Sequence, residues 1–531
     1  MQELKELNNK NGTADLKEQL LSADPPEVKL EKNMSAKEIE ELELVKDLLM
    51  FEKGIYNHDM PSLVAVLSKI AIATTQLASA MLGHSIMSCA GFVFLNMRGN
   101  LLNQTAFGLY ASYTLIFILA LNISIKEKIG ISVSVAIGEK DHRKCRILMM
   151  QGTFTSFFFF IVVDIPISFL ARPILVALGI SPDVAAVASS AVIWTLPVHA
   201  VNTVGELLRT YAMAQGQCEA IIGKTALPTA LFSFLCAYIF IIQYDMSIYG
   251  WILAKLVYEL IGLAVGYYCF YYTTHPETQY FEPMDAATPG LKEFIIDSVK
   301  FSLGSYTEFI GFEFTTYYVA LLHNNNYLAA YSSLVNVTGW VYCLGASFAI
   351  VSRTRINMLI GMGKIAAAKN FFIFFLSSIV FMGVLIGMLV FFFARNLIGM
   401  IYASSNEEMS STFKTILGIY CFCIPSEFSA TTTFVGIKTI GKIDILVIAN
   451  FITLIVGNGF GGFILSKLDF GPIILSSWLF ILLYFQNGLS AIYIIMHDWS
   501  TVKPLAEVPL NDVKEELNQR DKFNTGEIRE D

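Results

Sequence analysis

The sequence predicts an all-α membrane protein with twelve transmembrane helices in two pseudo-symmetric six-helix bundles. The first observation is composition: the 531 residues are 55% hydrophobic and only 15% charged, with a mean hydropathy of +0.57. That is more apolar surface than a soluble chain can bury. The second is the recurrence of long apolar segments along the chain. The third is a duplication, because residues 137–144 and 169–172 reappear in form 223 positions later, at 360–367 and 392–395.

The chain begins with residues 1–60, which are rich in Glu, Asp and Lys and are expected to form a cytosolic tail. They contain no short apolar stretch followed by a small-residue cleavage site, so we expect no secretory signal peptide. A similar charged segment, residues 497–531, ends the chain as a second cytosolic tail. These two tails supply much of the net charge of −8, which therefore carries no information about a substrate.

Between the tails lie apolar segments long enough, at about 1.5 Å per residue, to cross about 30 Å of hydrocarbon. Those at 61–272 form the predicted N-terminal bundle and those at 296–496 the C-terminal bundle. A polar, proline-containing linker at 273–295 joins them. The predicted spans are 62–96, 103–136, 148–171, 184–207, 221–243, 246–272, 296–322, 327–352, 370–394, 412–437, 443–466 and 471–496.

Orientation follows from basic residues in the short loops. With both tails inside, the inner loops carry twelve Lys and Arg residues and the outer loops carry five. We therefore expect a multi-pass integral membrane protein with both termini and the linker in the cytosol. Its membrane is either the plasma membrane or a vacuolar or other internal membrane.

Cofactor chemistry has little support in the sequence. The eight cysteines lie almost all within apolar segments and form no C-x-x-C pair, which is typical of small packing residues. The chain shows no G-x-x-x-x-G-K-[ST] loop for ATP phosphates. We expect no enzyme activity, no metal and no other cofactor, and any transport must then draw on an ion gradient.

Carboxyl groups deep in the predicted spans are the main candidate functional residues. A charge at the centre of a span costs about 2.5 to 3.5 kcal/mol on insertion scales. Glu308 and Glu427 are near midspan and have no basic residue within four positions. They are candidates for ion coupling, or else buried carboxyls satisfied by neighbouring hydroxyls. Glu313 lies five residues after Glu308, about 140° around the helix, so both cannot point into one cavity. Asp164 either serves function or bonds backbone groups freed by Pro166.

Other deep charges have alternative explanations. Glu206 and Arg209 are three residues apart and Lys255 and Glu259 are four apart, which predicts structural ion pairs on one helix face. The run 126–128, Lys-Glu-Lys, indicates either a water-filled vestibule or the meeting of two shorter segments. The aromatic side chains of span 7 are mostly packing and lipid contacts, although some could form walls that bind a cation. Those candidates are Tyr306, Phe309 and Phe312.

Several loops resemble the signature motifs of the multidrug and toxic compound extrusion (MATE) transporters. Residues 355–369, which include Arg355, Gly361 and Gly363, resemble the family's R-V-x-N-x-L-G-x-G-x-x-x-x-A motif. In the first half, residues 135–138, ending at Gly138, resemble its Q-A-x-G motif. The resemblance covers residues 62–496.

Two further motifs extend this resemblance. Residues 211–216, which end in Gln215 and Gly216, resemble the family's L-Q-A-Q-G motif. Residues 307–313 keep the spacing of C-L-E-W-W-x-F-E, a motif of the eukaryotic branch. On this match, Glu308 is the better candidate than Glu313 for a central cavity.

The chain also departs from the MATE pattern. Glu427 stands where the family usually has Asp in span 10, and Lys438 takes the position of an Arg in the following motif. Span 1 has neither the proline nor the Asp used by some bacterial members, so we expect no coupling site there.

The resemblance implies a secondary active antiporter that exports organic cations, drugs or metabolites in exchange for H⁺ or Na⁺ by alternating access. The expected partners are a small cationic substrate and the lipid bilayer, with no nucleic acid, and the expected state is a monomer. One alternative is a flippase for lipid-linked saccharides, which shares the broad architecture but favours a large cationic cavity. A channel or receptor is a third, disfavoured by the duplication and by the midspan carboxyls.

Overall fold

The computed structural model describes residues 48, 51, 60–98, 101–177, 180–216, 218–322, 324–396, 398 and 407–502. Most of the two predicted tails lies outside these residues. The described residues from 51 to 502 belong to one compact unit. The described elements of this unit are helical.

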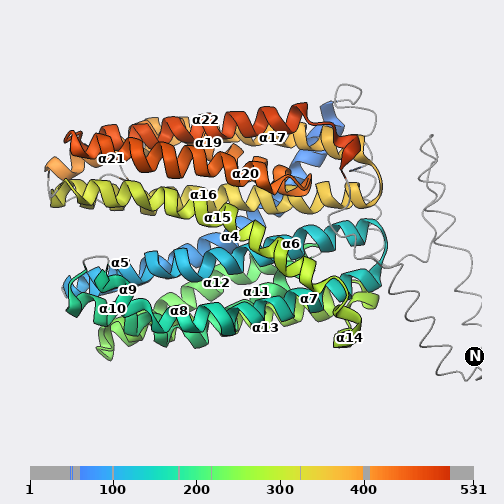
Figure 1. The fold of residues 1–531 in the computed structure, drawn as a ribbon, viewed down its shortest axis with the longest axis horizontal. Helices are drawn as coiled ribbons and strands as arrows, with labels where there is room; N and C mark the ends of the chain where they lie inside the picture. The colour runs from blue at the N-terminus through green and yellow to red at the C-terminus, as the bar shows by residue number, and fades with distance from the viewer. Residues whose placement is uncertain are drawn as a thin grey trace, which may run out of the picture. The chain divides into compact units, whose positions relative to one another are not determined.

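The first group of helices, called here the N-lobe, covers the first six predicted spans (Figure 1). Its fourth span bends by 42° between α10 and α11, where Pro197 in the first turn of α11 cannot donate a backbone hydrogen bond. The N-lobe elements are α4 (Met60–Met97), α5 (Leu101–Thr114), η3 (Leu115–Leu119), α6 (Ala120–Gly138), α7 (His142–Phe159), η4 (Phe160–Asp164), α8 (Ile165–Phe169), α9 (Ala171–Ala177), α10 (Pro182–Trp194), α11 (Leu196–Met213), α12 (Glu219–Tyr238), η5 (Ile239–Gln243) and α13 (Ser247–Tyr272).

The second group, called here the C-lobe, covers the last six predicted spans. Within it α19 packs against α16, α17 and α22, so it is the central helix. The C-lobe elements are α15 (Leu291–Ala320), α16 (Asn325–Gly361), α17 (Ile365–Leu389), η7 (Val390–Ala394), α19 (Glu407–Thr439), α20 (Ile443–Asn450), η8 (Phe451–Asn458), α21 (Gly459–Lys467) and α22 (Pro472–Met496). The short elements η6 (Pro276–Thr278) and α14 (Met284–Ala287) lie in the linker, and η9 (Trp499–Thr501) follows α22.

In the described part of the chain, nine helices are long and apolar enough to span a membrane, and the bent pair α10 and α11 makes a tenth. The other two predicted spans are α15 and α19, which form long helices but are less apolar. Their lower hydropathy comes from polar side chains, including Glu308 and Glu313 on α15 and Glu427 on α19. The two least apolar spans are thus the ones that carry the deep carboxyls of the C-lobe.

Helix α15 connects the two lobes. It begins at Leu291, inside the segment predicted as linker, so the connection from Thr273 is shorter than expected. Near its start, Phe294 is buried in an N-lobe core cluster with Ile125 and Ile129 of α6. Its later residues pack against α20 and η8 of the C-lobe, and the helix crosses between the two groups in Figure 1. Movement of one lobe against the other must therefore act on α15.

The two halves of the repeat meet at equivalent glycines. Gly138 ends α6 and Gly361 ends α16, and they are 223 positions apart, the offset of the duplication. A Cβ on either glycine would lie 3.0 Å from the Cα of the other. The loops that follow also correspond, since Lys140 (φ 61°) and Gly363 (φ 73°) both have left-handed backbone. The two lobes therefore touch, backbone to backbone, beside the loops that the sequence motifs mark.

Candidate functional site

A cavity of about 20 Å³ lies in the C-lobe, large enough for one water molecule or a small ion. Its polar lining comes from four helices: Glu308 of α15, Tyr342 of α16, Glu427 of α19, and the adjacent amides Gln486 and Asn487 of α22. Phe312 and other apolar side chains of α19, η8 and α22 complete the wall. The cavity is thus mainly apolar, and a few polar side chains contribute to its lining.

The two carboxylates of this cavity are held in different ways. Glu427 accepts a hydrogen bond from the hydroxyl of Tyr420, two turns earlier on α19. Glu308 is subject to the charges of Lys438 and Glu127, and its own charge acts on Glu427. Because both carboxylates line one small cavity in an apolar surround, they repel each other, and the uptake of a cation or a proton is favoured.

The two amides of the cavity lining use their nitrogens in hydrogen bonds within the C-lobe. The side-chain nitrogen of Asn487 donates to the carbonyl and hydroxyl oxygens of Ser426, at 3.0 and 2.9 Å. That of Gln486 donates to Asn450, which in turn donates to the carbonyl of Gly304 at 3.0 Å. The oxygens Gln486 Oε1 and Asn487 Oδ1 are buried and accept no hydrogen bond from the residues that the structure describes. Carboxylate and amide oxygens together form a donor set suited to a hard cation.

Sequence analysis missed the amides and Tyr342. Neighbouring Gln and Asn residues inside an otherwise apolar span are costly to insert, and this cost was the available signal. The hydroxyl of Tyr342 gave no comparable signal, because tyrosines are common throughout the spans.

The predicted site residues divide into two groups. Glu308, Glu427 and Phe312 line the cavity, whereas Glu313, Phe309 and Tyr306 are not among its lining residues. Tyr306 instead packs against the N-lobe core cluster that includes Phe294.

Asp164 lies apart from the cavity, in the N-lobe. Its side chain is fully buried at the end of the π-helical turn η4, and its Oδ2 accepts a 3.1 Å hydrogen bond from Asn122 of α6. Its Oδ1 has no hydrogen-bond partner. The carboxylate thus bonds a side chain of the neighbouring span rather than backbone groups near Pro166.

The run 126–128 lies within the continuous helix α6, so it does not mark the meeting of two segments. Lys126 donates to Asn202 of α11 at 3.4 Å, within the N-lobe. Glu127 forms an ion pair with Lys438 of α19, across to the C-lobe. Lys128 forms a 2.8 Å ion pair with Asp297 near the start of α15. Successive residues point in different directions around the helix and make three separate links.

Of the two ion pairs predicted in the N-lobe, one is present and the other is replaced by different contacts. Glu206 and Arg209 form the expected pair on α11. Glu259 accepts a 2.9 Å hydrogen bond from Asn202 instead of the expected salt bridge, and the ammonium of Lys255 lies 5.2 Å from the ring centre of Trp251. The indole face offers this lysine a competing cation–π contact.

Charge reversal tests whether the ion pair of Glu127 and Lys438 joins the two lobes. Lys438 is only 5% exposed, and a buried ion is strongly destabilising when its partner is removed, by about 3 to 5 kcal/mol. We expect Glu127→Lys and Lys438→Glu each to lower the melting temperature of the purified protein, and the double reversal to recover most of the loss. A double variant as unstable as the sum of the two singles would show that the pair does not join the lobes.

The motif residues of the loops make local contacts within each lobe and to the linker. Gln215 Oε1 accepts the backbone N–H of His275 at 3.0 Å and the hydroxyl of Thr278 at 3.1 Å, which fastens the linker to the N-lobe. Gly216 follows with φ 76°, a left-handed conformation that favours glycine. On the C-lobe side, Arg355 donates to the carbonyl of Val351 within α16 at 3.1 Å.

Comparison with known proteins gives a consistent result. Residues 302–462 match the MatE family model, and no curated protein matches the sequence. The eukaryotic MATE transporter AtDTX14 is similar in structure, with a TM-score of 0.74, 15% identity, and coverage of 86% of this chain and 97% of its own.

Two other similar structures are titled as transporters of the MOP superfamily. A MOP superfamily transporter from Pyrococcus furiosus, titled for the reverse polarity of its binding pocket, has a TM-score of 0.71 at 12% identity, covering 80% of this chain and 94% of its own. An outward-facing multidrug resistance MATE family transporter has a TM-score of 0.69 at 13% identity with the same coverages, 80% and 94%. Residues 302–462 thus match the MatE family model, and the chain has the fold of the MATE transporters.

Proposed function

We propose that this transporter is a secondary active antiporter that exports organic cations, drugs or metabolites in exchange for Na⁺ or H⁺. The observation that supports this most directly is the C-lobe cavity, which Glu308 and Glu427 line together with Gln486 and Asn487, whose buried amide oxygens have no hydrogen-bond partner among the described residues. Such a site gains stability by taking up a cation or a proton. One chain supplies both lobes and the whole cavity, so the proposal requires only a monomer.

Coupling in this proposal uses the position of α15. Glu308 lies on the helix that also packs into the N-lobe, and it is subject to the charges of the interlobe pair formed by Glu127 and Lys438. Neutralising the cavity carboxylates changes the electrostatic potential at the ion pair of Glu127 and Lys438. Ion binding and the contact between lobes are then linked, which is the requirement for alternating access.

We also propose on which side of the membrane the linker and the termini lie. The excess of basic residues in the loops on the linker side supports a cytosolic linker and cytosolic termini, in the plasma membrane or an internal membrane.

The alternative of a lipid-linked saccharide flippase is favoured by one feature of the N-lobe. Its interior contains three basic side chains, Lys126, Arg209 and Lys255, near the acidic Glu206 and Glu259. A basic interior suits an anionic phosphate-linked substrate.

Proteoliposomes separate the two candidates. We expect an imposed inward gradient of Na⁺ or H⁺ to drive ethidium in the opposite direction, with sidedness read from the protease accessibility of a tag at Asp531. Liposomes without protein and liposomes without a gradient are the controls. If no gradient moves a cationic dye while a lipid-linked sugar is translocated, the antiporter proposal is wrong and the flippase takes its place.

A further inference from the structure

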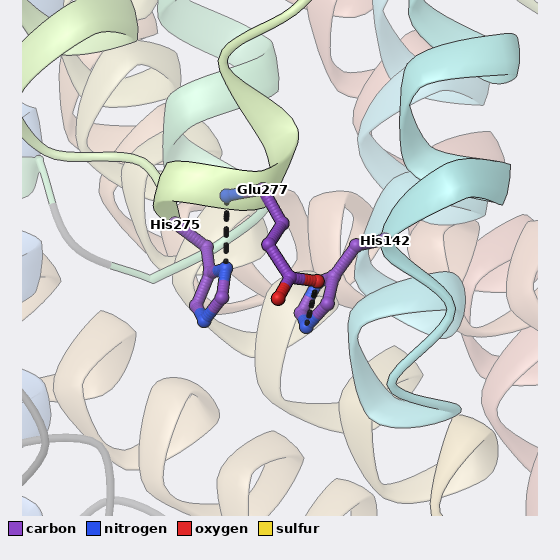
Figure 2. Close-up of side chains that lie close together, drawn as sticks. All are labelled: His142, His275 and Glu277. Carbon is purple, nitrogen blue, oxygen red and sulfur yellow. Dashed lines mark hydrogen bonds and ion pairs between the residues drawn. The ribbon is translucent and has the colours of Figure 1, made fainter. Parts of the chain in front are cut away.

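Three potential metal ligands meet where the linker touches the N-lobe. His142, His275 and Glu277 each offer one ligand atom, and these atoms lie within 4.8 Å of one another. In Figure 2 the side chains of His275 and Glu277 extend from the linker, and that of His142 extends toward them from α7. The ring centroids are 4.1 Å apart, and His142 Nε2 is 3.9 Å from Glu277 Oε2. This cluster is remote from the C-lobe cavity in sequence and shares no residue with it.

The backbone around each of the three residues is held in place. His142 is the first residue of α7, whose N-terminus is capped by Asp141 accepting the 2.9 Å hydrogen bond of Lys144 N. The N–H of His275 donates to Gln215, and the carbonyl of Glu277 accepts from Arg146. Ligands on fixed backbone lose little conformational entropy when a metal binds.

Nearby cations are neutralised by other partners. Arg146 forms a 2.6 Å ion pair with Glu282, and Lys144 forms a 2.8 Å ion pair with Glu139. The carboxylate of Glu277, in contrast, is largely exposed and its contact with His142 is long. The positive charges of these two side chains are therefore compensated, and they repel a divalent cation only weakly.

We propose that His142, His275 and Glu277 bind a first-row transition metal ion of the Zn²⁺ type. Two imidazoles and one carboxylate are a known Zn²⁺ ligand set, with water in the fourth position. Zn–N bonds of about 2.0 to 2.1 Å place tetrahedral ligand atoms about 3.4 Å apart. Since the two imidazole rings are stacked with their planes 7° apart, metal binding requires the rings to turn until their nitrogens point at one ion.

Metal binding would replace one weak hydrogen bond of the cluster, the one that the His275 ring accepts. His275 Nδ1 accepts the backbone N–H of Glu277 at 3.3 Å, which is long for a hydrogen bond. Coordination through Nδ1 takes the same lone pair, and coordination through Nε2 requires the hydrogen to be on Nδ1. The hydrogen bond is lost in both cases, and the metal–nitrogen bond replaces it.

The ion would join α7 of the N-lobe to the linker that leads into α15. His142 belongs to the N-lobe, whereas His275 and Glu277 belong to the linker element η6 and its flank. Bound metal should therefore restrict the linker, whether or not the antiport proposal is correct.

Titration of metal-free, purified full-length protein with Zn²⁺ by calorimetry, and with Co²⁺ followed by visible absorption, tests the site. We expect one bound ion per chain and the absorption of four-coordinate Co²⁺. His142→Ala, His275→Ala and Glu277→Gln should each weaken binding at least about tenfold, while the control His497→Ala should bind as the unaltered protein does. Since Glu277→Gln changes an exposed side chain, it keeps the test valid if a histidine variant fails to fold. Equal binding by the unaltered protein and Glu277→Gln, or absence of binding, would overturn the proposal.

Hydrogen exchange tests the effect on the linker without measuring transport. At a Zn²⁺ concentration just sufficient to saturate the unaltered protein, exchange at residues 273–290 should slow in that protein and in His497→Ala, and should slow much less in His142→Ala. If Zn²⁺ binds without slowing exchange in this segment, the inference that metal restricts the linker is wrong.

Discussion

Glu308→Gln is expected to abolish ion-driven export while the protein still folds and binds its substrate. Gln keeps the size and hydrogen-bonding capacity of the side chain but cannot ionise, so the cavity of Glu308 and Glu427 loses one of its two negative charges. Loss of even about 1.4 kcal/mol of cation binding reduces occupancy of the site tenfold at subsaturating ion. The measurement is the initial rate of gradient-driven dye transport in proteoliposomes, with dye binding measured separately.

Matched variants on the same helices identify the cause. Glu308→Asp should retain part of the activity because the charge remains, and Glu427→Gln should resemble Glu308→Gln. Glu313→Gln, on the same helix but not lining the cavity, should transport at nearly the normal rate. Normal rates for Glu308→Gln, with unchanged dependence on pH and Na⁺, would return this carboxyl to a structural role. The result for Glu427→Gln would then decide whether the C-lobe carries the ion site at all.

Gly361→Ala is expected to prevent the close contact between α6 and α16 and to reduce transport severely. The added Cβ would overlap the carbonyl oxygen of Val135 and lie 3.0 Å from the Cα of Gly138. These are backbone atoms of a helix, which cannot move aside as a flexible side chain does. The conformation with the lobes in contact should lose stability, seen as a lower melting temperature and a lower export rate.

Gly339→Ala is the control for this variant, since it lies on the same helix and its added Cβ would meet nothing within 4 Å. Replacing Gly by Ala within a helix is by itself favourable by roughly 0.5 to 1 kcal/mol. The control should therefore be as stable as the unaltered protein or more so. Gly138→Ala should behave as Gly361→Ala does, because the two glycines face each other. If Gly361→Ala and Gly339→Ala transport equally well, the glycine contact is not needed in the transport cycle.

Sequence alone determined the all-α membrane fold, because a span must present enough apolar residues to cross the hydrocarbon and must satisfy its backbone within a helix. Both requirements are local, and each of the twelve predicted spans falls on helix in the structure. The duplication likewise identified Gly138 and Gly361 as equivalent positions. The cost of a charge in lipid marked the deep carboxyls as candidates, and the MATE resemblance favoured Glu308 over Glu313.

Only the tertiary structure decided which of these residues meet. The rotation of each helix about its axis is set by packing against neighbours that are distant in sequence. For that reason the sequence did not reveal that Gln486 and Asn487 complete the cavity of Glu308, or that Lys126, Glu127 and Lys128 each bind a different helix. The cluster of His142, His275 and Glu277 was hidden for the same reason, since contact between α7 and the linker depends on the fold of the whole N-lobe.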